Sequence, residues 1–409
     1  MAKFVPFKAI RPRFELSEQV VTRSYESYSF KDRLNIQSQN PHSFLHVLNP
    51  EFESRVRLRG MKRYRKVREK LDEFLSSGIL TREDKPGFYL YRNTEEGQSA
   101  MGLLGGIAIS DYVNDSLKRH EDTLSIREKR FADFLQGAQF NAEPVLVTYP
   151  NHPEIDRLMA EINQTKPEIS FTDDQFVTHE LWSITEQHRI AQIEASFSEV
   201  AKTYLMDGHH RSASSVLYAN RNFSTYTNKE LPHQYFMGCL MPETEIRIAS
   251  FSRVLTNLGG LSYSEIFSQL RNNFLIEDMG EASWEPTASH EFSMFLGNRF
   301  YKLQWQNNHG AHYSPFSTLD AQILNAFILN PIFGITDPRN DERLNYLWGM
   351  HPGIEIQKAV ISGAFSIGFG MVPTALSEIK QIADAGKTLP PKSTFIKPKL
   401  PSGLTIYEL

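Results

Sequence analysis

The residues best suited to chemistry in this chain lie at positions 207–211, where the sequence is Asp-Gly-His-His-Arg. A carboxylate, two imidazoles and a guanidinium follow one another there. An apolar run at 203–206 predicts a strand before this motif, and residues 212–219 predict the start of a helix after it. A strand, a glycine turn and a helix N-terminus favour anion binding, because free backbone N–H groups and the positive end of the helix dipole face the same way.

Each residue of the motif suits phosphate chemistry. Gly208 permits the turn, and Arg211 offers a two-pronged donor to phosphate oxygens. Asp207, at the end of the strand, is suited to hold a metal or to orient a histidine. His209 and His210 can donate protons or neutralise developing charge. The alternative is an ordinary capped helix with a salt bridge and surface histidines.

A second polar group lies upstream, at 120–123, with the sequence His-Glu-Asp-Thr. Glu121, beside His120 and close to Thr123, is a candidate general base or metal ligand. The alternative is an acid that caps the helix predicted after it. No His-Glu-x-x-His motif occurs, and the single cysteine, Cys239, excludes a thiolate zinc cluster. A histidine-based metal site stays open, although no further motif in the sequence supports it.

The last third of the chain holds further polar candidates, namely Lys392, Ser393, Thr394, Arg253, Asp337 and Arg339. A lysine followed by two hydroxyls on a proline-stiffened turn can bind phosphate, although the glycine spacing of a Walker A loop is missing. The arginines and the aspartate are candidate anion or metal contacts. Each is equally well explained as part of a structural ion pair.

Composition limits the classes of protein to consider. With 40% hydrophobic and 22% charged residues, the 409-residue chain is typical of a soluble globular protein. Its net charge of -4 argues against a dedicated nucleic-acid binder, and the basic run at 55–70 is interpreted as the solvated face of a helix. The N-terminus has no signal-peptide core, and no apolar run approaches the roughly 18 residues that span a bilayer. We expect a cytoplasmic protein without a membrane partner; the oligomeric state stays open, a homodimer being compatible.

Several elements must position these residues. Strands are predicted at 43–48, 144–149 and 179–184, and the apolar run at 144–149 is typical of a buried strand. A helix is predicted from about 125 to 135, opened by a capping box of Ser125 and Glu128. The polar stretch at 151–174 is predicted to be a surface insertion.

Seven short motifs, in this order, resemble a bacterial family catalogued as domain of unknown function 1015. They lie at residues 7–12, 43–47, 120–123, 141–145, 207–211, 335–339 and 390–394. The match covers essentially the whole chain, and the Asp-Gly-His-His-Arg and Pro-Pro-Lys-Ser-Thr motifs are specific to the family.

The resemblance implies an α/β (α+β) fold with mixed sheets and several lobes, around a core similar to the ParB/sulfiredoxin fold. It favours an N-terminal α/β segment at 1–100, the core at 101–241 and a C-terminal α+β segment at 242–409 that closes the site. Relatives on that fold include free-serine kinases, and some family members are pyrophosphate-dependent serine kinases.

The activity implied by the resemblance is phosphoryl transfer between pyrophosphate or a nucleotide and a small hydroxyl substrate, above all free L-serine, in either direction. Arg211, the turn at Ser212 and Lys392 would hold the phosphates. Mg²⁺ would bridge phosphate oxygens, with Asp207 or Glu121 as its ligand. Glu121 would take the proton of the substrate hydroxyl, and one histidine of the motif would steady the transferring group.

Three positions depart from the family pattern. Glu26 stands in place of an aspartate, Ser252 in place of an asparagine, and Pro401 in place of an arginine. These departures favour the alternative function, a non-catalytic nucleotide- or phosphate-binding regulator of ParB-like fold. A nuclease on the same fold is disfavoured by the acidic charge balance.

Overall fold

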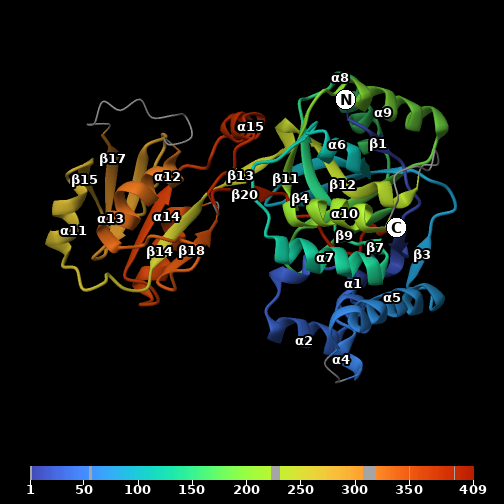
Figure 1. The fold of residues 1–409 in the computed structure, drawn as a ribbon, viewed down its shortest axis with the longest axis horizontal. Coiled ribbons are helices and arrows are strands. Elements are labelled where there is room, and N and C mark those ends of the chain that lie inside the picture. Colours follow the sequence, from blue (N-terminus) through green and yellow to red (C-terminus); the bar gives the residue numbers. More distant parts are fainter. Residues whose placement is uncertain (1, 55–57, 223–230, 307–318, 350, 391) are drawn as a thin grey trace. The chain divides into compact units, whose positions relative to one another are not determined.

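The computed structural model describes residues 2–54, 58–222, 231–306, 319–349, 351–390 and 392–409. The chain forms two compact units. The first contains the residues up to Ile246 together with Pro398–Leu409, and the second is Arg247–Lys397. The second unit is therefore inserted in the first, because the chain leaves the first unit at Ile246 and returns to it at Pro398 (Figure 1).

A large mixed sheet organises the first unit. Among the described residues its strands follow the order β6 (Leu117–Lys118), β11 (Thr203–Asp207), β8 (Val145–Tyr149), β12 (Tyr235–Pro242), β5 (Gln98–Ala108), β4 (Phe88–Glu95), β10 (Thr178–Ile184) and β9 (Ile169–Thr172), with β1 (Phe4–Val5) also paired to β5. β6 runs parallel to β11 and β8 parallel to β12, whereas the other neighbours are antiparallel. Mixed sheets with helices confirm the predicted α/β class.

The centre of this sheet is buried on both faces. Every residue of β8 and of β12 is buried. Such continuous apolar runs are typical of strands covered on both sides. Among the described residues of this unit, two further short ladders occur: β2 (Ile10–Pro12) with β3 (Leu80–Arg82), and β7 (Phe140–Asn141) with β21 (Tyr407–Glu408).

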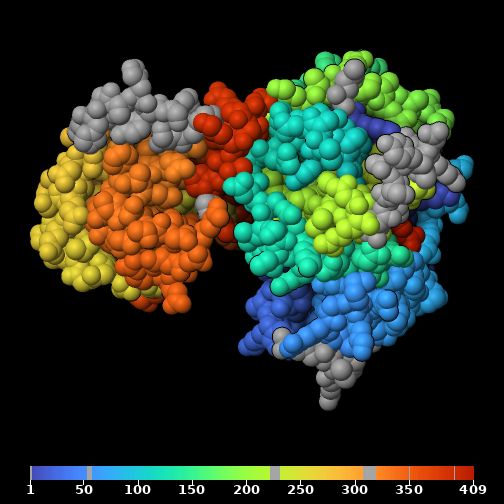
Figure 2. All heavy atoms as spheres, in the orientation of Figure 1, coloured from blue at the N-terminus to red at the C-terminus, as the bar shows by residue number. Residues whose placement is uncertain are grey.

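Helices cover the sheet of the first unit (Figure 1). The α-helices are α1 (Ser17–Val20), α2 (Phe30–Gln39), α3 (Leu45–Leu48), α4 (Glu51–Ser54), α5 (Gly60–Ser76), α6 (Ile109–Val113), α7 (Ser125–Ala138), α8 (Pro153–Asn163), α9 (Gln187–Glu199) and α10 (His209–Asn222). The 3₁₀ turns are η1 (Phe14–Leu16), η2 (Tyr25–Ser27), η3 (Pro232–Gln234) and η4 (Glu243–Glu245). α10 packs along α7, and Figure 2 shows their surfaces next to each other on one face of this unit.

The strand predicted at 43–48 is wrong, because this segment forms helix α3. The Ser43 hydroxyl accepts a hydrogen bond from the Leu45 N–H, which starts the turn. Phe44 and Val47 then bury their side chains in the same apolar cluster as Val67 of α5. Packing of this kind overrides the β propensity of the individual residues.

The surface insertion predicted at 151–174 is also wrong, because it contains helix α8 and the edge strand β9. Pro153 occupies the first turn of α8, where its missing N–H costs nothing. Ile155, Leu158, Met159 and Ile162 form a buried stripe at helical spacing and join the main core. Because polar residues lie between these four, the segment does not read as an apolar run in the sequence.

Helix α7 begins at Ser125, as predicted, but without the predicted capping box. Its N-cap is Leu124, and no side chain caps the helix. The Glu128 carboxylate instead accepts a hydrogen bond from the Thr123 hydroxyl. Glu128 therefore ties the 120–123 loop to the start of the helix.

The second unit is built on an antiparallel sheet. Among the described residues its order is β15 (Phe274–Gly280), β17 (Arg299–Trp305), β16 (Glu291–Leu296), β19 (Ile367–Met371), β14 (Phe251–Leu255) and β18 (Leu344–Trp348). A separate ladder joins β13 (Arg247–Ala249) to β20 (Phe395–Lys397). The helices are α11 (Tyr263–Leu270), α12 (Asp320–Leu324), the π-helical turn η5 (Asn325–Leu329), α13 (Asn330–Phe333), α14 (Pro352–Ile361) and α15 (Leu376–Asp384).

No helix in the described parts of either unit is both long and apolar enough to cross a membrane.

Candidate functional site

The Asp-Gly-His-His-Arg motif lies at the junction of β11 and α10. Asp207 ends the strand, just after a register shift against β8 that follows Leu205. Gly208 has a φ of 96°, in the region that favours glycine, and its N–H donates to the Asp207 Oδ1 atom at 2.9 Å. The helix then begins at His209, three residues before the start predicted from the sequence. A strand–glycine–helix junction is therefore present at the predicted motif.

The first turn of α10 presents the free N–H groups. In an α-helix the first N–H groups have no partner four residues back, and here they belong to His209, His210 and Arg211. Ser212 lies deeper in the helix and is fully buried. Its N–H donates to the Gly208 carbonyl at 3.0 Å and its hydroxyl to the His209 carbonyl at 3.0 Å. The donors available to an anion therefore precede Ser212.

Arg211 is held in place along one edge of its guanidinium. Its Nη1 atom lies 3.0 Å from the Glu143 Oε1 atom and donates to the backbone carbonyls of Glu143 and Pro144 at 3.2 and 2.6 Å. The Glu143 carboxylate also accepts a hydrogen bond from the Ser402 hydroxyl at 3.0 Å. This anchoring positions the Nη2 edge of Arg211, which lies 4.0 Å from Asp207.

Asp207 lies between two cations. The Lys399 Nζ atom donates to its Oδ2 atom at 3.1 Å, and Arg211 flanks the same oxygen. Burial alone would raise the pKa of Asp207, but the charges of Lys399 and Arg211 outweigh it and hold the pKa below its ordinary value. Asp207 is therefore ionised at neutral pH. About a third of its side chain (37%) is exposed to solvent.

Lys399 and Glu143 are site residues that the sequence analysis did not select. Glu143 lies in the 141–145 motif that supports the family resemblance, and its place in that motif could have identified it as a candidate. Lys399 had no such signal, because it is 192 residues from Asp207 along the chain.

Replacing Lys399 with methionine is expected to lower stability by about 0.2–1 kcal/mol near neutral pH, as for other partly exposed pairs. The loss should shrink in acid. The pKa of Asp207 is depressed in the fold, so the pair contributes above the ordinary carboxyl pKa of about 3.9 and disappears as pH falls through the lower folded value. Urea unfolding at pH 6 and pH 2.5 measures this. Lys166→Met, at an exposed lysine, is the control, and an equal loss at both pH values would contradict the assignment.

His120, Glu121 and His209 form a compact cluster next to this turn. One ligand atom from each lies within 4.8 Å of the others, and His209 Nδ1 is 3.6 Å from Glu121 Oε2. Burial lowers the pKa of His120 to about 4. Burial, and next the neighbouring His120, hold the pKa of His209 well below its ordinary range. Both imidazoles are therefore neutral at neutral pH. The third member of the cluster, Glu121, differs from them in its burial, because 45% of its side chain is exposed.

His210 has other charged neighbours than His209 does. Burial is the main cause that lowers its pKa, and the charge of Arg127 adds to it. The carboxylates of Glu128 and Glu26 act on the same ring in the opposite direction. Glu26, in η2, and Thr123, through Glu128, therefore belong to the surroundings of the motif.

The predicted residues of the last third lie in the second unit. Arg253 is fully buried, and its Nη1 and Nη2 atoms donate to the carbonyls of Phe251 and Lys392 at 2.6 and 3.2 Å. Burial lowers the pKa of Arg253 to about 10. Ser393 is buried and donates to the Pro390 carbonyl at 2.8 Å, and Thr394 is buried beside it. These contacts make the 392–394 turn a structured part of this unit.

Asp337 and Arg339 form a local turn in the second unit. The Asp337 carboxylate accepts hydrogen bonds from the Arg339 N–H at 3.0 Å and from the Asn340 side chain at 2.7 Å. The hydrogen bond from the Arg339 backbone N–H is the main cause that lowers the pKa of Asp337, and the Asn340 side chain adds to it. The aspartate thus has a structural partner in this turn.

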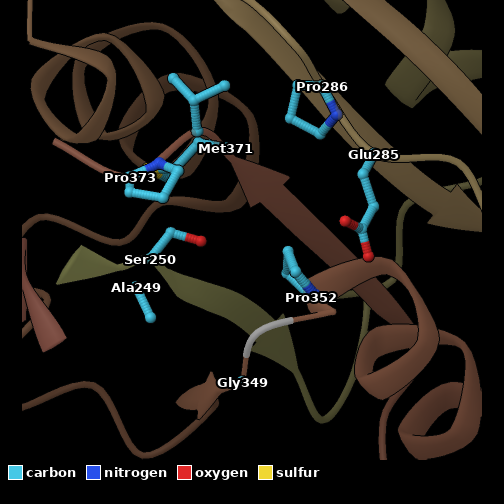
Figure 3. Close-up of a pocket in the computed structure, with 9 residues that line it drawn as sticks. Ala249, Ser250, Glu285, Pro286, Gly349, Pro352, Met371 and Pro373 are labelled. Atoms are coloured by element: carbon cyan, nitrogen blue, oxygen red, sulfur yellow. The ribbon is translucent and has the colours of Figure 1, made fainter. Parts of the chain in front are cut away.

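A small cavity also lies in the second unit, lined in part by Ser250, Glu285, Pro352 and Met371 (Figure 3). The buried Ser250 hydroxyl has no hydrogen-bond partner among the described residues. Glu285 accepts a hydrogen bond from the Gly353 N–H at 3.0 Å. The lining includes none of the residues predicted from the sequence to form the site.

The described residues can accommodate Mg²⁺ in a limited way. This ion prefers oxygen ligands and is commonly bound by one or two carboxylates together with phosphate oxygens and water. Asp207 and Glu121 supply such carboxylates, although both Asp207 oxygens already accept hydrogen bonds from Gly208 and Lys399. A Mg²⁺ ion here would therefore depend on the phosphates of a bound substrate.

Comparison with known proteins gives one family match. A family model described as "Protein of unknown function (DUF1015)" matches residues 4–322. No curated protein matches the chain.

Solved structures show loose likenesses. C-terminally truncated SbnI from Staphylococcus aureus is 13% identical, with 72% of this chain and 82% of that chain covered and a TM-score of 0.36. A free serine kinase in complex with AMP is 10% identical, with coverages of 75% and 91% and a TM-score of 0.37. A conserved hypothetical protein from Pyrococcus furiosus is 10% identical, with coverages of 75% and 94% and a TM-score of 0.35. These likenesses are too loose to assign a function, which depends on the residues of the site.

Proposed function

Because the chain belongs to the DUF1015 family, described as proteins of unknown function, we propose its function from the site itself: phosphoryl transfer between pyrophosphate or a nucleotide and the hydroxyl of a small molecule such as free L-serine. The observation that carries this proposal is the β11–α10 turn. A helix N-terminus, Arg211 and Lys399 meet there around Asp207, and the carboxylate of Glu121 lies beside His209.

Phosphate oxygens would bind at the first turn of α10. The N–H groups of His209, His210 and Arg211 and the helix dipole favour an anion at that position. The carboxylates of Asp207 and Glu143 largely offset the charges of Lys399 and Arg211. Two more arginines add positive charge, because Arg119 acts electrostatically on His209 and Arg127 on His210.

Glu121 would act as the general base. Its side chain is partly exposed and so accessible to a substrate hydroxyl. The carboxylate would take the hydroxyl proton as the substrate oxygen forms its bond to phosphorus, and the bond from phosphorus to the departing phosphate oxygen would break. Neutral His209 and His210 could donate hydrogen bonds to the transferring group. A Mg²⁺ ion held by Asp207 or Glu121 would offset phosphate charge.

The test uses the full chain with serine, Mg²⁺ and one donor at a time: pyrophosphate, ADP or ATP. Phosphorus NMR should detect O-phosphoserine with at least one donor, or hydrolysis of added phosphoserine in the reverse direction. Absence of both reactions with every donor would refute the proposal.

The alternative function, a non-catalytic nucleotide-binding regulator, draws on the same turn. Lys399 and Gly208 already engage both oxygens of Asp207, as expected for a turn that binds phosphate without consuming it. This alternative predicts saturable nucleotide binding by calorimetry with no turnover of serine. The Mg²⁺ ion, the second-unit residue Lys392 and the ParB/sulfiredoxin-like core stay predictions in both cases.

A further inference from the structure

We propose that the first unit binds one divalent transition-metal ion of the Zn²⁺ class through His120, Glu121 and His209. The proposal does not rest on phosphoryl transfer, although it shares Glu121 with that proposed function. It assigns these donors to a kind of ion different from Mg²⁺.

The topology of the sheet brings the three donors to one edge. β6 and β11 are parallel neighbours, with Lys118 opposite Tyr204. The residues that follow each strand therefore emerge at the same edge of the sheet. His120 and Glu121 follow β6, and His209 follows β11 after the glycine turn.

The separations are close to those of a metal site. Zinc binds imidazole nitrogen and carboxylate oxygen at about 2.0–2.2 Å, which places two ligands of a tetrahedral site about 3.4 Å apart. His209 Nδ1 and Glu121 Oε2 are 3.6 Å apart, and the ligand atoms of all three residues lie within 4.8 Å of one another. The rings of His120 and His209 pack edge to face, with centroids 4.6 Å apart. Small side-chain rotations would close this arrangement around an ion.

The buried nitrogens of the cluster lack partners. His120 is 0% exposed, and neither of its ring nitrogens has a hydrogen bond of ordinary geometry among the described residues, although the ring interacts with the backbone carbonyl of Leu205. His209 is 5% exposed, and its Nε2 atom also lacks a partner there. Buried polar atoms without partners are rare and call for an explanation, such as a bound ion. A metal ion bound beside Glu121 would give the His120 ring a partner and would contact His209 through Nδ1, the nitrogen that faces Glu121.

The chemistry of the donors selects the class of ion. Two imidazoles and one carboxylate form a set used by catalytic zinc sites, which keep a further position for water or substrate. Imidazole nitrogens suit Zn²⁺, Co²⁺ and Fe²⁺, whereas Mg²⁺ prefers oxygen ligands alone. The positive end of α10 would oppose a cation, but Glu121 and the nearby Asp207, which acts electrostatically on both rings, supply compensating negative charge.

The test uses metal-depleted full-length protein without serine or phosphate donor. Titration with Co²⁺ should give the visible absorption of an imidazole-ligated ion, and elemental analysis after Zn²⁺ loading and desalting should find one ion per chain. A large excess of Mg²⁺ should not displace it. Because no substrate is present, a negative result here leaves the phosphoryl-transfer proposal standing, and a negative serine assay leaves this one standing.

Variants locate the ion. His120→Ala and His209→Ala should each weaken binding by more than about tenfold, since even outer partners of metal ligands cost 10–100-fold. Glu121→Gln, at a partly exposed position that should not disturb folding, should do the same. His188→Ala, at an exposed histidine on α9, should bind as the parent does. The proposal fails if no stoichiometric ion binds, or if Glu121→Gln leaves both affinity and the Co²⁺ spectrum unchanged.

Discussion

Glu121→Gln is expected to reduce the rate of phosphoserine formation by about 10²–10⁴-fold, the usual contribution of a general base. The amide keeps the size of the side chain but cannot accept the substrate proton. Glu121 is 45% exposed and meets His209 at 3.6 Å, so the variant should stay folded. Steady-state kinetics by phosphoserine release should show the loss mainly in kcat, with KM for serine little changed.

The matched control is Asp122→Asn, which removes the same charge from the next residue of the same exposed loop. Its rate should stay within a few-fold of the parent, because its carboxylate is not the proposed base. Equal losses in both variants would indicate a general effect of loop charge and would remove Glu121 from the role of base. A base other than Glu121 would also be indicated if E121Q kept the parent's dependence of kcat on pH.

Gly208→Ala is expected to produce the largest loss of stability among single changes at the site. The φ of 96° is strained for any residue with a Cβ atom, at a cost of about 1–3 kcal/mol. The added carbon would lie 2.7 Å from Val145 Cγ1 and 3.2 Å from Arg211 Cζ. The overlap with the buried strand β8 and with the anchored guanidinium should distort the turn, so phosphate or nucleotide binding should be lost as well.

Gly97→Ala separates the two causes. Gly97 lies in the hairpin between β4 and β5 with a φ of 75°, and an added Cβ there meets nothing within 4 Å. It should therefore show the backbone cost alone. Urea unfolding of both variants would measure the difference, and equal losses would mean that contacts with Val145 and Arg211 do not constrain the turn.

The strand–turn–helix at 203–222 could be predicted because its signals are local. An apolar run, a glycine and a polar helix start follow one another directly in the sequence, and the geometry of such a junction is fixed by the backbone. The contact between Glu121 and His209 could not be predicted from local signals alone. It depends on β6 pairing parallel to β11, and here only the order of motifs in the family resemblance linked the two segments.

The charge balance of the turn could not be predicted from the same signals. Asp207 depends on Lys399, 192 residues away, and Arg211 depends on Glu143, 68 residues away. Each contact is a single polar pair with no periodic pattern behind it. The wrong assignments at 43–48 and 151–174 have a related cause, because burial against α5 and against the main sheet decided between helix, strand and loop there.

Because the chain returns to the first unit at Pro398, this site is completed only after the second unit has been synthesised. The N-terminal strand β2 bonds to Ile406, through Ile10, and Asp207 meets Lys399, so the first unit needs residues that are synthesised after the second unit. The second unit, Arg247–Lys397, is continuous and can fold while the first is still open. A nascent or prematurely terminated chain that lacks Pro398–Leu409 would thus contain a complete second unit and a β11–α10 turn without its lysine.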